Sequence, residues 1–340
     1  MLMKNFVILV TGGAGYIGSH TALSLIKNGY NVVIFDNLEN GHKKAVDTIA
    51  NIKAEGKVVD FIQGDLKNRN DISKVFEKHN ICAVLHFAAY IQVEESVKNP
   101  QKYYQNNIGG SLNLLNAMIK NSVNKIVFSS TAAVYGEPKY TPIDENHPQN
   151  PINPYGWSKM IVEKILSDYS DVYDLKNARL RYFNVAGADS ETRIGEMHDP
   201  ETHLVPNVLM AASDPKKIFQ LYGDDFDTRD GTCVRDYVNV EDLADAHVSA
   251  LQYLLNGGKS DCFNLGTNEG NTVKEIFDAC ERITQIKINR EINARRAGDP
   301  AALVACNKKA REILGWNPKR SIDDSIRTAY AWILKKENKT

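Results

Sequence analysis

The stretch that decides the fold is FVILVTGGAGYIG, residues 6–18, in which an apolar run leads directly into a glycine-rich turn. The run predicts a buried strand over 6–10, and the segment after the turn predicts a helix over 17–28. Gly12, Gly15 and Gly18 would permit a tight turn, let backbone N–H groups approach a pyrophosphate, and let the helix pack closely on the sheet. A Walker A loop is excluded, because Ser19-His20 and not lysine follow Gly18.

Outward from this stretch, β-rich apolar segments alternate with helix-period segments over about the first 185 residues. The expected strands are residues 6–10, 31–35, 58–63, 83–86, 125–129 and 178–182, with helical segments such as 17–28 and 100–120 between them. This alternation predicts an α/β fold with a doubly wound parallel sheet of the Rossmann type. After Gly187 the pattern becomes irregular up to a helix expected near 322–334, which predicts a smaller C-terminal α/β domain.

Composition limits the kind of partner. In 340 residues, 41 Lys and Arg balance 42 Asp and Glu, so we expect no nucleic-acid partner and no membrane surface. The five cysteines form no CxxC pair, which favours reduced thiols in a cytoplasmic protein. The apolar run at 6–10 is too short for a signal-peptide core or a membrane span. The eight histidines form no HExxH motif or close pair, so we expect no metal and a structural role for His198 and His203.

Asp36 is expected to select the cofactor. It ends the second expected strand, 18 residues after Gly18, where a carboxylate accepts hydrogen bonds from an adenosine ribose 2′-OH. A carboxylate there repels a 2′-phosphate, so the sequence favours NAD over NADP. Asp65 and Leu66 follow the third strand, and Phe87 and Ala88 the fourth, where loops pass such a cofactor. Two alternatives stay open, namely that Asp65 is a surface cap and that Asn106 makes only local contacts.

A second group of residues indicates proton transfer. Asn153 and Pro154 predict a helix start, so that Tyr155 and Lys159, four residues apart, share one helix face. A tyrosine base at neutral pH needs its pKa lowered by roughly 3 units, and the charges of Lys159 and an oxidised nicotinamide act in that direction. Thr131 or Ser130, at the end of the fifth strand, would relay the proton.

These motifs occur in one order together with LRYFN at 180–184, DGTCVRDY at 230–237 and RRAGD at 295–299. In that combination the chain resembles the extended short-chain dehydrogenase/reductases over nearly its whole length, and within them the members that invert C4 of UDP-sugars. The resemblance implies that bound NAD takes a hydride from C4 and returns it to the other face of a 4-keto sugar. It thus implies interconversion of UDP-glucose and UDP-galactose.

The resemblance also implies a set of site residues. Catalysis would fall to Tyr155, Lys159 and Thr131, and the arginines of the second half would clamp the UDP diphosphate. The implied cofactor-binding residues are Gly12, Gly15, Tyr16, Ile17, Gly18, Asp36, Asn37, Asp65, Leu66, Phe87, Ala88, Asn106, Ser129, Tyr155, Lys159 and Tyr182. The implied substrate-binding residues are Thr131, Tyr155, Asn184, His203, Leu204, Tyr222, Arg235, Arg296, Asp299 and Leu303. For Arg235 a structural pair with Asp236 is the alternative, and for Tyr222 ordinary core packing.

The expected specificity for the sugar depends on Leu303. In the family this position borders the sugar's C2 side, and a residue smaller than tyrosine implies that N-acetylated UDP-sugars are accepted too. Core packing of Leu303 is the alternative.

The chain departs from the family pattern at three positions. Ile91 stands where many members carry lysine, Thr131 where serine is usual, and His203 where asparagine is common. Two rival functions are a sugar-nucleotide 4,6-dehydratase or decarboxylase and a non-catalytic NAD-binding regulator. Ala132-Ala133 after Thr131 argue against the first, because elimination needs an acid there, and the Thr131, Tyr155 and Lys159 set argues against the second.

The resemblance finally sets the expected organisation. Residues 1–187 would form the NAD-binding domain with Tyr155 and Lys159, and residues 188–340 mainly the UDP-sugar-binding domain, with some of it crossing back to the first. A homodimer is expected to form through the two helices that carry Asn106 and Tyr155.

Overall fold

The computed structural model describes residues 7–296 and 299–337. Its centre is a parallel sheet of seven strands among the described residues, in the order β11-β6-β5-β4-β1-β2-β3. The strands are β1 (Val7–Thr11), β2 (Asn31–Asp36), β3 (Val58–Gln63), β4 (Ile81–His86), β5 (Lys125–Thr131), β6 (Lys176–Tyr182) and β11 (Asp261–Leu265). The strand order reverses between β1 and β4, and crevices at such a point bind ligands in doubly wound sheets.

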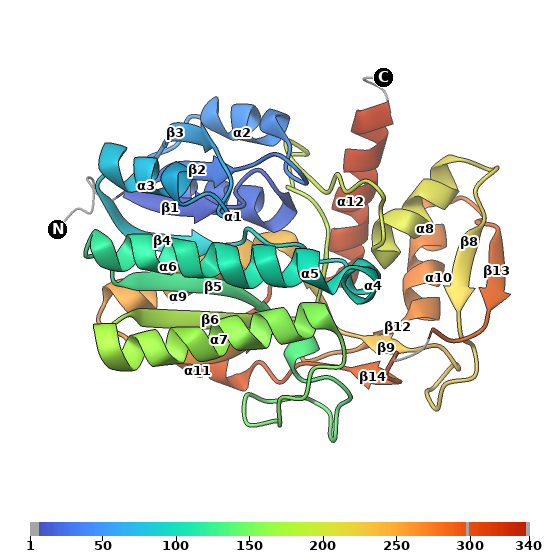
Figure 1. The fold of residues 1–340 in the computed structure, drawn as a ribbon. Helices are drawn as coiled ribbons and strands as arrows, with labels where there is room; N and C mark the ends of the chain where they lie inside the picture. The colour runs from blue at the N-terminus through green and yellow to red at the C-terminus, as the bar shows by residue number, and fades with distance from the viewer. Residues whose placement is uncertain (1–6, 297–298, 338–340) are drawn as a thin grey trace.

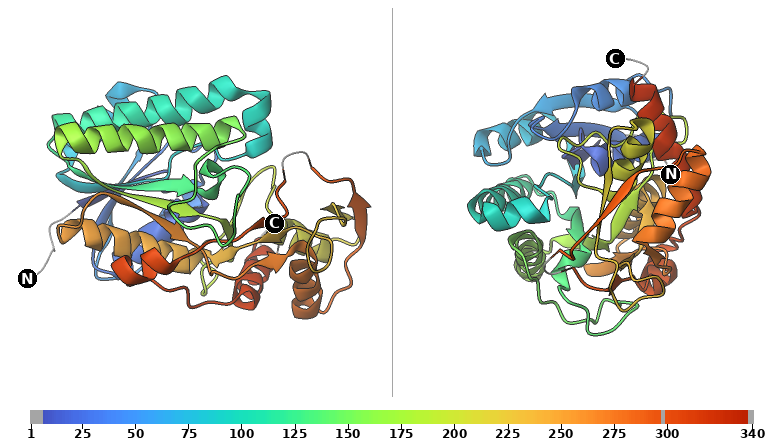
Figure 2. Two further views of the ribbon diagram at one scale, coloured as in Figure 1. Left: turned by 90° about the horizontal axis from the view of Figure 1, so that it is seen from below. Right: turned by 90° about the vertical axis from the view of Figure 1, so that its right-hand side faces the viewer.

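Helices cover both faces of this sheet, which gives three layers (Figures 1 and 2). One face packs on α1 (Tyr16–Lys27), α2 (Lys43–Ala50), α9 (Val240–Leu255) and α11 (Lys308–Leu314). The other packs on α3 (Arg69–Lys78), α6 (Ser111–Lys120) and α7 (Pro154–Tyr173). Ile8 and Val10 belong to the first apolar core and Leu9 to the second, because successive strand side chains point to opposite faces.

A smaller lobe lies beside the carboxyl ends of the strands (Figure 1). It contains α8 (Leu204–Ser213), α10 (Val273–Thr284), α12 (Ile322–Glu337) and the strand pair β8 (Phe219–Tyr222) with β13 (Arg290–Asn293). A third apolar core, which includes Leu209, Phe277 and Ile326, holds the three helices together. Short strands complete the lobe: β9 (Val234–Arg235) between β12 (Asn271–Thr272) and β14 (Ala302–Leu303), and β10 (Tyr237–Asn239) against β7 (Asn184–Ala186).

The predicted fold class is confirmed. Each of the six expected strands is present with ends within two residues of those expected, except that Phe6 lies outside the described residues. The expected helices at 17–28 and 322–334 correspond to α1 and α12.

Two features differ from the expectation. The seventh strand, β11, comes from residues 261–265 and was not predicted. The single helix expected over 100–120 is instead α5 (Pro100–Tyr103), a π-helical segment (Tyr104–Gly110) and α6, and it is preceded by the short α4 (Val93–Lys98). Among the described helices, none is long and apolar enough to cross a membrane.

Candidate active site

A cavity of about 520 Å³ opens at the point where the strand order reverses. It is lined by the loops after β1, β2, β3 and β4, by the end of β5, by the start of α7 and by the loop before α8. Of the residues predicted from the sequence, it brings together Gly12, Gly15, Tyr16, Ile17, Gly18, Asp36, Asn37, Asp65, Leu66, Phe87, Ala88, Asn106, Ser129, Thr131, Tyr155, Tyr182, Asn184 and His203. Lys159, Leu204, Tyr222, Arg235, Arg296, Asp299 and Leu303 do not line it.

The glycines of the turn after β1 serve different purposes. Gly12 has φ +72°, and a Cβ on it would lie 2.6 Å from the backbone nitrogen of Ala88. A Cβ on Gly18 would collide with the carbonyl of Gly12, so the first turn of α1 needs glycine there to lie against the preceding loop. A Cβ on Gly15 would have no protein neighbour nearer than 3.3 Å, yet Gly15 lines the cavity. The space above Gly15 is thus left for a ligand, as a pyrophosphate at the N-terminus of α1 requires.

Asp36 lies in this cavity at the end of β2, with 6 % of its surface exposed. One carboxylate oxygen accepts from the N–H of Ala14 at 3.0 Å and the other from the N–H of Leu38 at 2.8 Å. Burial raises the pKa of this carboxyl, and these two hydrogen bonds oppose the rise. The side chain is thereby fixed beside the glycine-rich turn, where it suits a ribose hydroxyl. Together, the cradle at Gly15 and this carboxylate fit an adenine dinucleotide.

The start of α7 positions the tyrosine. The side chain of Asn153 accepts from the N–H of Gly156 at 2.8 Å and Pro154 occupies the first turn, so the predicted helix start is confirmed. Tyr155 in this first turn faces the cavity, and a hydrogen bond joins its side chain to that of Thr131. Ser130, the alternative relay, donates instead to Glu163 on the other side of β5. Thr131 is therefore the strand-end hydroxyl that meets Tyr155.

Lys159 is buried next to the cavity residue Ser129 and does not itself line the cavity. Its ammonium donates to the carbonyl of Ser129 at 2.8 Å, and burial lowers its pKa to about 7 against the opposing charge of Glu163. Burial raises the pKa of Tyr155 to about 12, and only the bond to Thr131 opposes this rise. In the protein without cofactor, the pKa of Tyr155 therefore lies above its usual value, although a base at neutral pH needs it lowered, and Lys159 is not among the causes of the shift.

Four of the residues expected to bind the UDP part of the substrate form two contacts with one another in the smaller lobe. The guanidinium of Arg296 stacks over the ring of Tyr222 at 4.0 Å from its centroid. Arg235 pairs with Asp299 at 3.4 Å and donates to the carbonyl of Pro300 at 2.8 Å. Asp236 does not pair with Arg235, because its oxygens accept from the N–H groups of Thr267, Asn268 and Ala305. Ala297 and Gly298 of the same motif lie outside the described residues.

Leu303 and Leu204 pack against two different apolar clusters outside the cavity lining. Leu303 in β14 is half-buried and packs against an apolar cluster that contains Ala132, Val134 and Phe183, close in sequence to Thr131 and Asn184. Leu204 begins α8, directly after His203.

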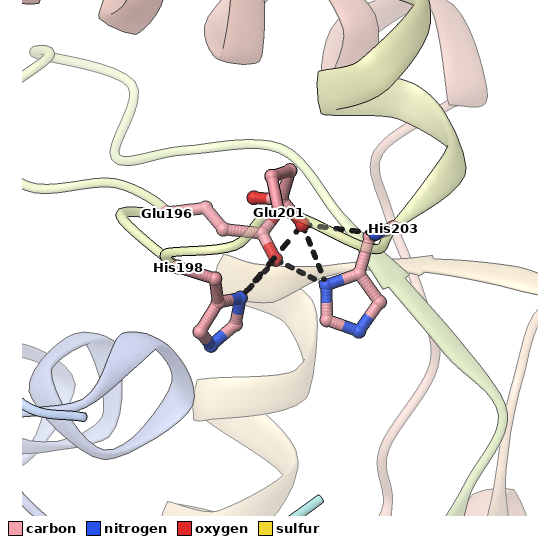
Figure 3. Close-up of side chains that lie close together, drawn as sticks. All are labelled: Glu196, His198, Glu201 and His203. Atoms are coloured by element: carbon pink, nitrogen blue, oxygen red, sulfur yellow. Dashed lines mark hydrogen bonds and ion pairs between the residues drawn. The ribbon is translucent and has the colours of Figure 1, made fainter. Parts of the chain in front are cut away.

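His203 and His198 belong to a four-residue cluster that the sequence did not reveal (Figure 3). Glu196 Oε1 accepts from Nδ1 of His203 at 2.5 Å and of His198 at 2.8 Å, and Glu201 Oε1 lies 3.3 Å from Nδ1 of His203. Burial alone would raise the pKa of Glu196 and lower that of His203. Their pairing outweighs burial, so the pKa of Glu196 is lowered and that of His203 is raised. The two carboxylates therefore favour the protonated form of His203, which lies on the cavity wall. Although the sequence contains no close histidine pair, His198 and His203 lie near each other because the loop at 196–203 folds back on itself. Among the described residues, only these four belong to the cluster.

Sequence reasoning missed further lining residues. Glu39, Tyr90, Glu95 and Lys102 all line the cavity, and Lys102 is the only lysine or arginine among its described lining residues. Ile91, where a lysine was expected from the family pattern, also lines it. Asn107, buried beside Asn106, exchanges two hydrogen bonds with the backbone of Tyr90 and donates to Ser158 Oγ at 3.0 Å. Adjacent asparagines inside a helical segment were the available signal, because they break its apolar pattern.

Comparison with known proteins shows the family to which the chain belongs. A family model described as GDP-mannose 4,6 dehydratase matches residues 9–329. A UDP-glucose 4-epimerase from Rhizobium leguminosarum bv. trifolii is 49% identical over 333 residues, which are 98% of this chain and 99% of that protein. The chain belongs to the UDP-glucose 4-epimerase family. The predicted family is thereby confirmed, and with it the prediction that the chain is an isomerase.

Two solved structures extend the UDP-glucose 4-epimerase relationship to three dimensions. An epimerase from Stenotrophomonas maltophila, with bound NAD and formylated UDP-arabinopyranose, has a TM-score of 0.94 at 39% identity and covers 98% of this chain and 99% of its own. A UDP-Glc/GlcNAc 4-epimerase from Campylobacter jejuni has a TM-score of 0.84 at 38% identity and covers 97% and 99%. The second lobe is therefore shared with these epimerases as well as the Rossmann sheet.

Proposed function

We propose that the enzyme interconverts UDP-glucose and UDP-galactose by inverting C4, with NAD retained through turnover. The observation that supports this most is that Tyr155 and Thr131 share one cavity with the glycine cradle and with Asp36, in a chain of the epimerase family. The Stenotrophomonas relative carries NAD and a UDP-sugar derivative together. Asp36 favours NAD over NADP, because its charge opposes a 2′-phosphate.

The residues divide the chemistry as follows. The glycine cradle and Asp36 would hold NAD, and when bound the cofactor would supply hydride acceptance and return at C4 of the sugar. Tyr155 takes the proton of the 4-hydroxyl and gives it back, and Thr131 relays that proton over the hydrogen bond between them. Burial keeps the phenol protonated in the protein alone, so the positive charge of an oxidised nicotinamide is needed to favour the phenolate.

The second lobe holds the nucleotide part of the substrate. Arg235 and Arg296 carry guanidinium groups suited to a diphosphate, and Tyr222 offers a ring face beside them. His203 and Asn184 line the same cavity as Tyr155 and are proposed to contact the part of the substrate nearer the sugar. Asp299 is available to a ribose hydroxyl.

The decisive experiment is to incubate purified protein with UDP-galactose and no added cofactor. We expect UDP-glucose to form without net oxidation, and denatured protein to release NAD(H) and essentially no NADP(H). Loss of water to give a 4-keto-6-deoxy sugar would favour the dehydratase alternative, which the alanines in the turn Ala132–Val134 after Thr131 oppose. Absence of any turnover would favour a non-catalytic NAD-binding protein.

N-acetylated UDP-sugars are proposed as further substrates. Leu303 lies against Ala132 and Val134, which follow Thr131, and its side chain is smaller than that of a tyrosine. The Campylobacter relative is named for both kinds of sugar.

We further propose a cytoplasmic homodimer that pairs through the helices carrying Asn106 and Tyr155. Val97 of α4 is 61 % exposed, and Tyr104 and Trp157 on the neighbouring helices are 38 % and 39 % exposed, so this face offers apolar area for a second copy. The five cysteines are unpaired, as a reducing compartment requires. Light scattering after gel filtration should give twice the chain mass.

A further inference from the structure

Two loops meet over the carboxyl end of β1. β2 and β4 are the neighbours of β1 in the sheet, and the loops that follow them carry Glu39 and Tyr90. The phenol of Tyr90 donates to Glu39 Oε2 at 2.5 Å. This contact joins the two loops beside the glycine-rich turn, which follows the strand between them.

The contact is part of a larger network. Lys102 Nζ lies 4.1 Å from the centroid of the Tyr90 ring, 2.8 Å from Glu95 Oε1 and 3.8 Å from Glu39 Oε1. Glu95 also accepts from the phenol of Tyr103 at 2.9 Å. Since Glu95 lies in α4 and Lys102 in α5, the network fastens the loop after β2 to the first helices after β4. We call Glu39, Tyr90, Glu95 and Lys102 the strap.

The charges of the strap argue for a structural clamp. All four side chains line the cavity, yet two of them are carboxylates, which disfavour a direct contact with an anionic pyrophosphate. Lys102 lies between the two carboxylates, so its charge is largely matched within the strap. Tyr90 is buried and contributes its ring to a cluster with Tyr103 and Tyr155, which anchors the strap to α7.

We infer that the strap retains NAD in the cavity between turnovers by holding these two loops together. The inference rests on the proposed function, because an enzyme that takes a hydride and returns it to the same substrate has no use for cofactor exchange. Both loops line the cavity together with the cradle and Asp36, so a cofactor held there would be flanked by the loop of Glu39 and the loop of Tyr90. Its release then requires the strap to open.

The test measures cofactor release directly. Wild type, Glu39→Ala and Tyr90→Phe are purified with their bound NAD, and the NAD left on the protein is assayed at intervals during dialysis. Tyr90→Phe keeps the ring and removes only the hydroxyl. A hydrogen bond to a charged group contributes enough for us to expect release about 10-fold faster or more in each variant.

The control is Lys98→Met, which removes the exposed ion pair with Glu94 on α4 outside the cavity. It should retain NAD as long as wild type. The double variant Glu39→Ala/Tyr90→Phe should release NAD no faster than Glu39→Ala, because that change already removes the hydrogen bond that Tyr90→Phe breaks. Added NAD should raise the turnover of both single variants and leave that of wild type unchanged.

The outcomes separate the two hypotheses. Equal retention by wild type, Glu39→Ala and Tyr90→Phe, with NAD present in all and UDP-galactose epimerised, overturns the strap and leaves the function standing. A wild type that contains no NAD(H) overturns the proposed function itself. Circular dichroism spectra that match wild type establish that the variants fold.

Discussion

Tyr155 combines two requirements that oppose each other. It must be buried so that its proton passes only to the sugar and to Thr131, and this burial raises the pKa of its phenol to about 12. Lys159 does not reverse the effect, since its own ammonium is buried and donates to a backbone carbonyl. We therefore expect the positive charge of an oxidised cofactor to favour the phenolate, which would tie proton removal to the presence of that cofactor.

Replacement of Tyr155 by phenylalanine should lower turnover of UDP-galactose by about 10²- to 10⁴-fold, the usual contribution of a general base. UDP affinity, measured by calorimetry, should change little because the ring remains. Tyr169→Phe is the matched control, since Tyr169 lies on the same helix and its hydroxyl donates to Asn116 on the exposed side. Near-normal epimerisation by Tyr155→Phe would refute the role of this phenol.

Leu303→Tyr should suppress turnover of UDP-N-acetylgalactosamine and spare UDP-galactose, because the larger ring would occupy the space next to the sugar's C2 substituent. The ratio of kcat/KM for the two sugars is the measurement. Leu303→Met, which keeps the volume nearly constant, should leave the ratio unchanged. A wild-type enzyme with no activity on N-acetylated sugars would show that the inferred space is closed to substrate.

Among the elements, α7 connects local sequence most directly to the site. Asn153 and Pro154 fix where the helix begins, and Tyr155 and Lys159 follow within its first two turns. The local pattern was sufficient to predict this helix start. It was also sufficient for β1 and α1, whose glycines are required by close backbone contacts between neighbouring elements.

Asn153→Ala should reduce the free energy of unfolding by about 1 kcal/mol, the usual effect of losing an N-cap, as measured by urea titration. Turnover should also fall, because a frayed first turn no longer holds Tyr155 against Thr131. Asn153→Asp retains an acceptor for the N–H of Gly156 and should restore stability. Equal stability of the alanine variant and wild type would contradict a capping role.

Other elements depend on distant partners and escaped prediction. The π-helical segment at 104–110 has no distinct apolar period, and it is stabilised by contacts such as that of Asn107 with the loop at Tyr90 and with α7. Strand β11 is short and joins the sheet only because β6 leaves an edge for it. The strap and the Glu196 cluster likewise arise from loops whose paths are set by tertiary packing.

For the whole molecule, the cluster at 196–203 predicts a pH dependence of stability. Pairing depresses the pKa of Glu196 and raises that of His203 to about 10. Glu196 contributes fully to the free energy of unfolding above pH 4.5, which is the pKa of its carboxyl in the unfolded chain, and this contribution is lost as the pH falls. His203 contributes fully to the free energy of unfolding below pH 6.5, which is the pKa of its imidazole in the unfolded chain. This contribution is lost as the pH rises toward 10.

The contribution to stability is therefore greatest between about pH 4.5 and 6.5. His203→Asn should lower the melting temperature more at pH 5.5 than at pH 9, so that the variant depends less on pH over this interval. Glu196→Gln should reduce the dependence in the same way, because it removes the charge that holds the proton on His203. A parallel pH profile for wild type and His203→Asn would contradict the pairing.

The place of β11 in the sheet has a consequence for how the chain is made. Strand β6 is complete at residue 182, but its partner β11 and the covering helix α9 arrive only with residues 240–265. During synthesis from the N-terminus, the emerging chain therefore presents an unpaired edge of β6 and the sheet face that α9 later covers, while some eighty further residues are added. Until then the edge is exposed to other nascent chains, so the ribosome-bound intermediate, more than the finished enzyme, should depend on chaperones.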